Sequence, residues 1–133
     1  MKKLLCIVTL FLAIISKATA TTTFQNYLPC ALTVTVVCYD MGCAIVSETN
    51  YNIPAGAQGA PSQVKMVDCV SPPYCTVWTI RYANLACTAV ASVSDASCCG
   101  FLQSTTFAGC PGTACQSGGT IDVSFGGGFV KIY

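Results

Sequence analysis

The chain has 133 residues, of which 53% are hydrophobic and only 8% are charged, and its formal net charge is +1. An ordinary soluble domain carries about 25% charged residues. Such a neutral chain excludes a basic nucleic-acid binder and a charged disordered tail, and its length excludes a multidomain protein.

The N-terminus has the features of a secretory signal peptide. Lys2 and Lys3 precede an apolar run over residues 4–15, and an Ala-Thr-Ala sequence ends at Ala20. The run is shorter than the roughly 20 apolar residues of a transmembrane helix. We therefore expect residues 1–20 to be cleaved and residues 21–133 to form a single β-sandwich domain. This leaves three basic and five acidic residues, and so a net charge of −2.

Cleavage also removes Cys6, so an even number of cysteines remains. An even number of cysteines in an exported chain is typical of disulfides, whereas a zinc site is disfavoured because the chain has no histidine. The adjacent pair Cys98 and Cys99 should bond to two different partners. We expect the following residues to form disulfides: Cys30, Cys38, Cys43, Cys69, Cys75, Cys87, Cys98, Cys99, Cys110 and Cys115.

Alternation of apolar and polar residues with a period of two dominates the rest of the chain. It predicts strands over residues 31–39, 44–53, 64–70, 76–82, 87–93, 120–125 and 129–133. Three glycines separate the last two strands and indicate a hairpin. Residues 94–119 contain four cysteines and are expected to form a stapled loop region. The pattern predicts a disulfide-stapled β-sandwich of about seven antiparallel strands, with a small β-barrel as the alternative.

The chain offers little for catalysis. Without histidine it lacks the commonest general base, and no two of its five acidic residues are close in sequence. Asp40 and Asp95 are interpreted as turn residues, and Asp122 is expected to face solvent. We therefore expect no catalytic residue, no metal and no cofactor. A hydrolase that uses paired carboxylates is the least favoured hypothesis.

Three aromatic residues are candidates for ligand contact: Trp78, Tyr82 and Tyr74. Exposed aromatic rings with polar groups could stack on a glycan. However, Trp78, Ile80 and Tyr82 alternate onto one face of a predicted strand, which favours a place in the core.

The expected surface is neutral and rich in threonine, so little charge repulsion would keep copies apart. Residues 31–37 and 120–125 contain no lysine, arginine or proline, the residues that usually protect sheet edges. Thr21, Thr22, Thr23 and Phe24 could form an assembly arm that adds a strand to a neighbour, or an ordinary first strand. Pairing of the arm in cis or in trans is left open.

Several motifs resemble those of small exported β-proteins of Bacteroidota-type bacteria. They are Phe24-x-Asn26, Cys30-x3-Val34-x-Val36, Cys38 and Ile53-Pro54-Ala55-Gly56. They cover about the first third of the expected mature chain. The resemblance implies strands, a bridge and a turn, and it brings no activity and no functional residue.

The sequence favours a secreted, non-enzymatic structural or interaction protein that self-assembles at or outside the cell surface as a homo-oligomer or filament. The alternative is a small secreted binding protein for a glycan or a target protein, acting as an inhibitor or effector. In either case we expect no nucleic-acid partner and no membrane anchor after cleavage. In a bacterium the chain would pass through the periplasm.

Overall fold

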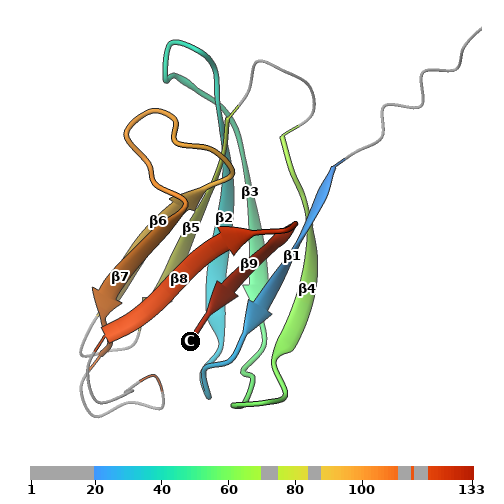
Figure 1. Ribbon diagram of the computed structural model, residues 1–133, viewed down its shortest axis with the longest axis vertical. Coiled ribbons are helices and arrows are strands. Elements are labelled where there is room, and N and C mark those ends of the chain that lie inside the picture. Colours follow the sequence, from blue (N-terminus) through green and yellow to red (C-terminus); the bar gives the residue numbers. More distant parts are fainter. Residues whose placement is uncertain (1–19, 70–74, 84–87, 111–114, 116–119) are drawn as a thin grey trace, which may run out of the picture.

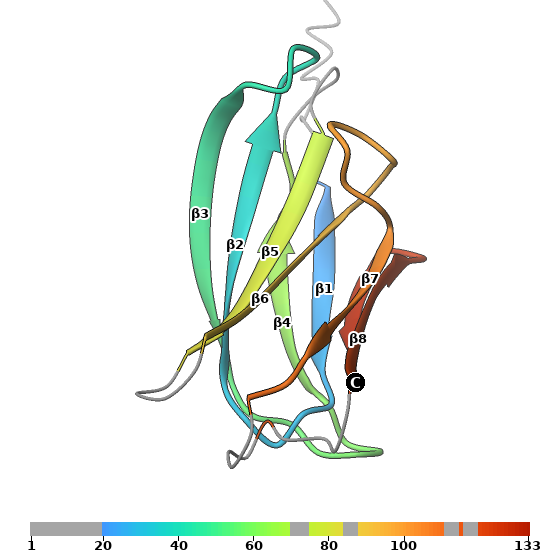
Figure 2. The same ribbon diagram turned by 90° about the vertical axis from the view of Figure 1, so that its left-hand side faces the viewer.

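The computed structural model describes residues 20–69, 75–83, 88–110, 115 and 120–133. The described residues form two facing β-sheets (Figures 1 and 2). The five-stranded sheet has the order β4-β1-β9-β8-β7 and the four-stranded sheet the order β3-β2-β5-β6. The strands are β1 (Thr21–Asn26), β2 (Leu32–Tyr39), β3 (Ile45–Ile53), β4 (Ser62–Val67), β5 (Cys75–Ala83), β6 (Thr88–Ser94), β7 (Ser104–Ala108), β8 (Thr120–Gly126) and β9 (Phe129–Ile132). The predicted all-β sandwich is confirmed, and the two sheets do not close into one barrel.

The N-terminal segment takes one of the two forms that the sequence left open. Residues Thr21, Thr22, Thr23 and Phe24 belong to β1, which pairs antiparallel with β4 and parallel with β9 of its own chain. Thr22 and Phe24 alternate into the interior, and Phe24 is fully buried. Because β1 lies inside a sheet and contributes to the core, it is the ordinary first strand and not a detached assembly arm.

The edges expected from the sequence also differ from those observed. Residues 31–37 lie largely in β2, which is flanked by β3 and β5, and residues 120–125 lie in β8, which is flanked by β7 and β9. These two segments lack lysine and proline because they are interior strands that are apolar on one face. The true ends of the sheets are β3, β6, β4 and β7.

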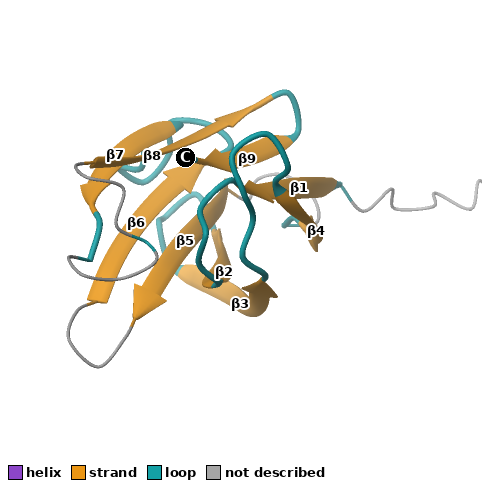
Figure 3. Cartoon of the chain, turned by 90° about the horizontal axis from the view of Figure 1, so that it is seen from below, coloured by secondary structure: helices purple, strands orange, loops and turns teal. Residues whose placement is uncertain are grey.

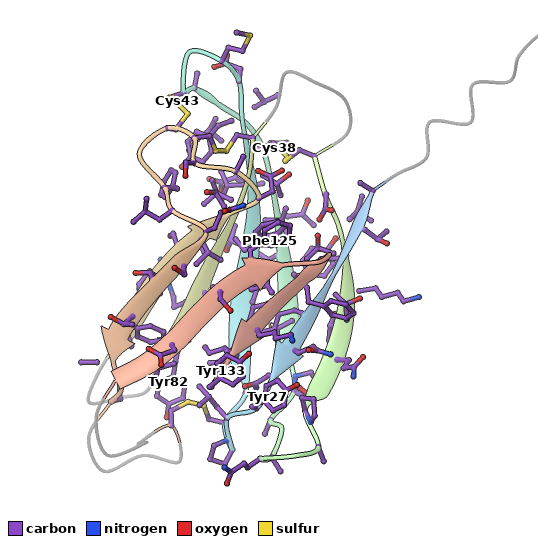
Figure 4. The ribbon with its side chains drawn as sticks, in the orientation of Figure 1. Tyr27, Cys38, Cys43, Tyr82, Phe125 and Tyr133 are labelled. Carbon is purple, nitrogen blue, oxygen red and sulfur yellow. A yellow bond between two sulfur atoms is a disulfide. The ribbon has the colours of Figure 1, made fainter. Side chains whose placement is uncertain are left out.

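The core lies between the two sheets and is centred on Trp78. Trp78 and Phe24 are fully buried, and Trp78 stacks on Phe125 of the opposite sheet with 4.9 Å between ring centroids. Figure 4 shows Phe125 near the middle of the molecule. Burial of a large aromatic side chain contributes about 1.5–3 kcal/mol or more, so this stack is a principal link between the sheets.

The predicted C-terminal hairpin is confirmed. In the antiparallel pair β8·β9, Gly126 lies opposite Phe129, so Gly127 and Gly128 form the two-residue turn. Both have positive φ angles, 59° and 80°. This is the geometry of a type I′ turn, which glycine adopts without steric cost.

The loop after β6 covers part of the outer face of the four-stranded sheet. There Val37 and Val77 are buried, with Tyr39 and Phe101 packed against them. This second, smaller core explains why strands β2 and β5 carry apolar residues on both faces at this end.

Two disulfides fasten this loop through the adjacent cysteines. Cys98 bonds to Cys75 in β5, and Cys99 bonds to Cys43 in the β2–β3 turn. The prediction that Cys98 and Cys99 have different partners is therefore confirmed.

The remaining described disulfides join distant parts of the chain. Cys30 bonds to Cys115, and Cys38 bonds to Cys69, across 85 and 31 residues respectively. Cys110 is also disulfide-bonded, and Cys87 lies outside the described residues. Figure 4 shows Cys38 and Cys43 at the same end of the sandwich.

The Cys43–Cys99 bond closes 56 residues of chain. In the chain-entropy account, a loop of this length is worth about 4 kcal/mol, and measured values are commonly about 2–4 kcal/mol. We expect the double variant Cys43→Ser/Cys99→Ser to lose free energy of unfolding in that range, as measured by urea denaturation of the oxidised protein. An unchanged free energy of unfolding would show that this bond does not hold the loop.

Candidate interaction surface

The two long sides of the sandwich differ in how the terminal strands of the two sheets are connected. Seen along the strands, β6 and β7 lie at one side and β3 and β4 at the other (Figure 3). The β6–β7 side is joined through the loop, where the Ser94 amide donates to the Leu102 carbonyl at 2.9 Å and the Phe125 amide to the Gln103 carbonyl at 2.7 Å. The β3–β4 side is bridged at Tyr51, whose hydroxyl accepts the Val67 amide at 3.1 Å.

Strand β3 is the most exposed strand described. All of its residues from Ile45 to Asn50 are exposed, on both faces of the sheet. Ile45 is 56% exposed and Val46 51%, and nearby in β4 Val67 is 48% exposed. Large apolar side chains at such exposure on a terminal strand are an unprotected surface.

The sequence of β3 contains none of the usual protection against pairing with another strand. Its nine residues include no lysine, arginine or proline, and Glu48 is its single charge. By contrast, β4 carries the exposed Lys65, and the Tyr51 hydroxyl already occupies the Val67 amide. Since an edge strand presents a row of N–H and C=O groups, β3 is the better site for an added strand.

A pocket of about 310 Å³ lies between β3 and the end of β4. Val36, Cys38, Ser47 and Thr49 come from the neighbouring strands β2 and β3, where Val36 faces Thr49 and Cys38 faces Ser47. Val46 and Val67 add apolar surface, and the Cys38–Cys69 disulfide fixes the two sides to each other.

Asp68 is the single charged residue in the lining of this pocket. Its Oδ2 accepts a hydrogen bond from the Thr22 hydroxyl at 2.8 Å, whereas its Oδ1 is buried and has no hydrogen-bond partner within the described part of the chain. Burial raises the pKa of the Asp68 carboxyl above its usual value, the Thr22 hydrogen bond lowers it in part, and the charge of Asp95 raises it further. The pocket therefore contains an incompletely satisfied acid.

The outer face of the four-stranded sheet is a different kind of surface. Its hydroxyl and amide groups bond to one another, as in Thr35 to Asn50 at 2.6 Å and Thr79 to Ser92 at 3.0 Å. A hollow of about 330 Å³ adjoins Arg81. Because these polar groups already have partners, this face offers less unsatisfied bonding capacity than the β3 edge.

The aromatic residues proposed as ligand contacts do not form a surface. Trp78 has no solvent exposure, so its assignment to a glycan site is wrong, and the core interpretation is confirmed. Tyr82 is half-buried and packs against the same core. Tyr74 lies outside the described residues.

The acidic residues take the local roles expected of them. Asp40 Oδ1 accepts the amides of Gly42 and Ala44 at 2.8 and 2.9 Å, which confirms its place in a turn. The Asp95 carboxylate bonds the Thr76 amide, and Asp122 is exposed as expected. Cys75, Asp95 and Cys98 place their ligand atoms within 4.8 Å, but both cysteines are in a disulfide and offer no thiolate for a metal.

Sequence reasoning missed both the β3 edge and the Asp68 pocket. The absence of lysine, arginine and proline was noted for residues 31–37 and 120–125 but not for residues 45–53, which share it, and only the order of strands shows that this third segment is terminal. Asp68 lies within the predicted strand 64–70, although the observed β4 ends at Val67, and its burial depends on β1 and on a disulfide that spacing does not reveal.

Comparison of the chain with protein-family models, with curated proteins and with solved structures gave no match. Among the described residues, no helix is long and apolar enough to cross a membrane.

The raised pKa of Asp68 predicts a pH dependence of stability. As pH rises, the carboxyl ionises first in the unfolded chain and only later in the folded one, so the free energy of unfolding falls across that interval. The variant Asp68→Asn should lack this decline, so its free energy of unfolding relative to that of the wild type should rise as the pH increases from acid toward neutral. Urea denaturation across this range measures the difference, with Asp122→Asn on β8 as the control that keeps the decline. A difference in free energy of unfolding between Asp68→Asn and the wild type that does not change with pH would contradict the interpretation.

Proposed function

We propose that this protein is an exported, non-enzymatic structural or interaction protein that self-assembles by adding a strand to β3. The observation that carries the proposal is the exposure of β3 on both faces, with Ile45 and Val46 more than half exposed on a strand without lysine, arginine or proline. Natural sheets generally protect such an edge, so an unprotected one is more consistent with pairing in the assembled protein.

The energetics favour such pairing. Each backbone hydrogen bond formed at an edge contributes about 0.5–1.5 kcal/mol net, and burial of exposed valine and isoleucine adds about 25 cal/mol per Å². The expected mature charge of −2 gives little repulsion between copies. An added strand of five or six residues could therefore stabilise a specific contact.

Export is supported by two independent features. The N-terminal sequence has the pattern of a signal peptide, and the described disulfides are typical of proteins in oxidising compartments. The final location, extracellular or on the cell surface, belongs to the proposal.

A second candidate function is that of a small secreted protein that binds a protein target. The observation in its favour is the Asp68 pocket beside the β3 edge, because strand addition commonly uses such pockets for specificity. Glycan binding through aromatic residues has less support, since Trp78 is in the core.

The self-assembly proposal predicts a defined effect of a charge on β3. Purified oxidised protein should associate with increasing concentration in sedimentation velocity and show oligomers or filaments by electron microscopy. The variant Val46→Lys should abolish this association, because lysine on an edge strand opposes pairing. Val90→Lys is the matched control, since Val90 is 47% exposed on β6 at the other side of the sandwich, and it should associate normally.

A protein that stays monomeric at high concentration would refute self-assembly. Equal loss of association in both variants would show that the effect is general to surface charge and not specific to β3.

A further inference from the structure

We propose that the Asp68 pocket binds the side chain of a lysine carried by an extended segment of a partner protein that pairs with β3. This inference rests on the second candidate function, in which β3 pairs with a strand of a protein target; such a target and a second copy of this chain would compete for the same edge. It adds the chemistry by which one partner strand would be distinguished from another.

The position of the pocket fits a side chain from an added strand. Ser47 and Thr49 of β3 contribute to its lining on the face of the sheet that points toward the opposite sheet. Side chains of a strand alternate between the two faces, so every second residue of a segment paired with β3 would point toward this side. One of these residues would lie at the mouth of the pocket.

The lining of the pocket fits an aliphatic stem with a positive end. Val36, Val46 and Val67 supply apolar walls, and the lysine stem can cover apolar surface while its ammonium group reaches a polar partner. Asp68 is the single charge available to such a side chain in the lining. A negatively charged or purely apolar side chain would leave the Asp68 carboxylate without a positively charged partner.

The state of the Asp68 carboxylate favours lysine over arginine. Its Oδ2 is already engaged by the Thr22 hydroxyl, while Oδ1 is buried without a partner among the described residues. A guanidinium group binds a carboxylate best through two parallel hydrogen bonds, whereas an ammonium group is a compact point charge that needs one oxygen. Because Oδ1 has almost no exposed surface, the lining must shift slightly to admit a ligand, and a compact ammonium group on a flexible stem suits this oxygen better than a broad guanidinium group.

The partner is expected to be a protein other than a folded second copy. Two lysines lie in described strands: Lys131 belongs to the interior strand β9, and Lys65 pairs with Thr23 on the outer face of the five-stranded sheet, where the neighbouring Met66 is the residue that is buried. A copy that added its β4 to β3 with the inner faces continuous would direct Lys65 away from the pocket. An extended segment with lysine among its inward residues meets the requirement.

The test uses four peptides and the full oxidised protein at a concentration where it is monomeric. The probe is the acetylated, amidated heptapeptide TVTKTVT, in which valine and lysine alternate with threonine. Matched probes replace lysine by norleucine, arginine or glutamate. Affinity is measured by calorimetry, and the site is located by NMR shifts of the Ser47 and Cys69 amides.

We expect the lysine peptide to shift these amides and to bind about tenfold more tightly than the norleucine peptide. The arginine peptide should bind less tightly than the lysine peptide, and the glutamate peptide most weakly. Asp68→Asn should reduce the lysine preference, whereas Asp122→Asn should leave it unchanged.

Equal binding of the lysine and norleucine peptides would overturn the inference while leaving strand addition at β3 in place. Shifts away from Ser47 and Cys69, or no binding by any peptide, would also overturn it. Neither result affects the assembly experiment with Val46→Lys, so failure of the pocket and failure of self-assembly can be told apart. The norleucine comparison uses the unaltered protein and does not depend on the folding of a variant.

Discussion

The structure depends on mutual burial of two apolar sheet faces around Trp78. Each sheet has one face that cannot remain in water, and the Trp78–Phe125 stack joins the two faces at their centre. β1 has its place for the same reason, because Phe24 fills the core from between β4 and β9. This packing buries the inner faces of the sheets but does not cover the terminal strands at the two sides of the sandwich. The two sides differ in how these strands are connected.

Two disulfides fasten the loop after β6 at one end of the sandwich, and the β3 edge remains uncovered. The adjacent cysteines 98 and 99 bring the loop after β6 over the outer face, where it forms a second small core on Val37 and Val77. The same loop joins β6 to β7. No comparable element among the described residues covers β3, although Cys43, just before it, is fastened to that loop. The strand β3 is thus paired on one side with β2 and open on the other.

Much of the fold could be predicted from local pattern, and the interaction surface could not. Seven of the nine strands followed from alternation, and the β8–β9 turn followed from its glycines. β7 was missed because its five residues lie among closely spaced cysteines. For β1 the sequence did not decide between an assembly arm and a first strand, because the strands that pair with it are remote in sequence. Trp78 was correctly favoured as a core residue. The position of β3 at the end of a sheet is a property of long-range strand order, and the burial of Asp68 depends on Thr22 and on the Cys38–Cys69 bond.

The most direct measurement of the central claim is residue-resolved hydrogen exchange in dilute and in concentrated protein. Every second amide of β3 points away from β2, and these amides should exchange freely when the protein is dilute. If copies pair through β3, exchange at these amides should slow with concentration, while exchange in β6 and β7 should not change. Slowing confined to β6 or β7, or no slowing at any edge, would contradict the account.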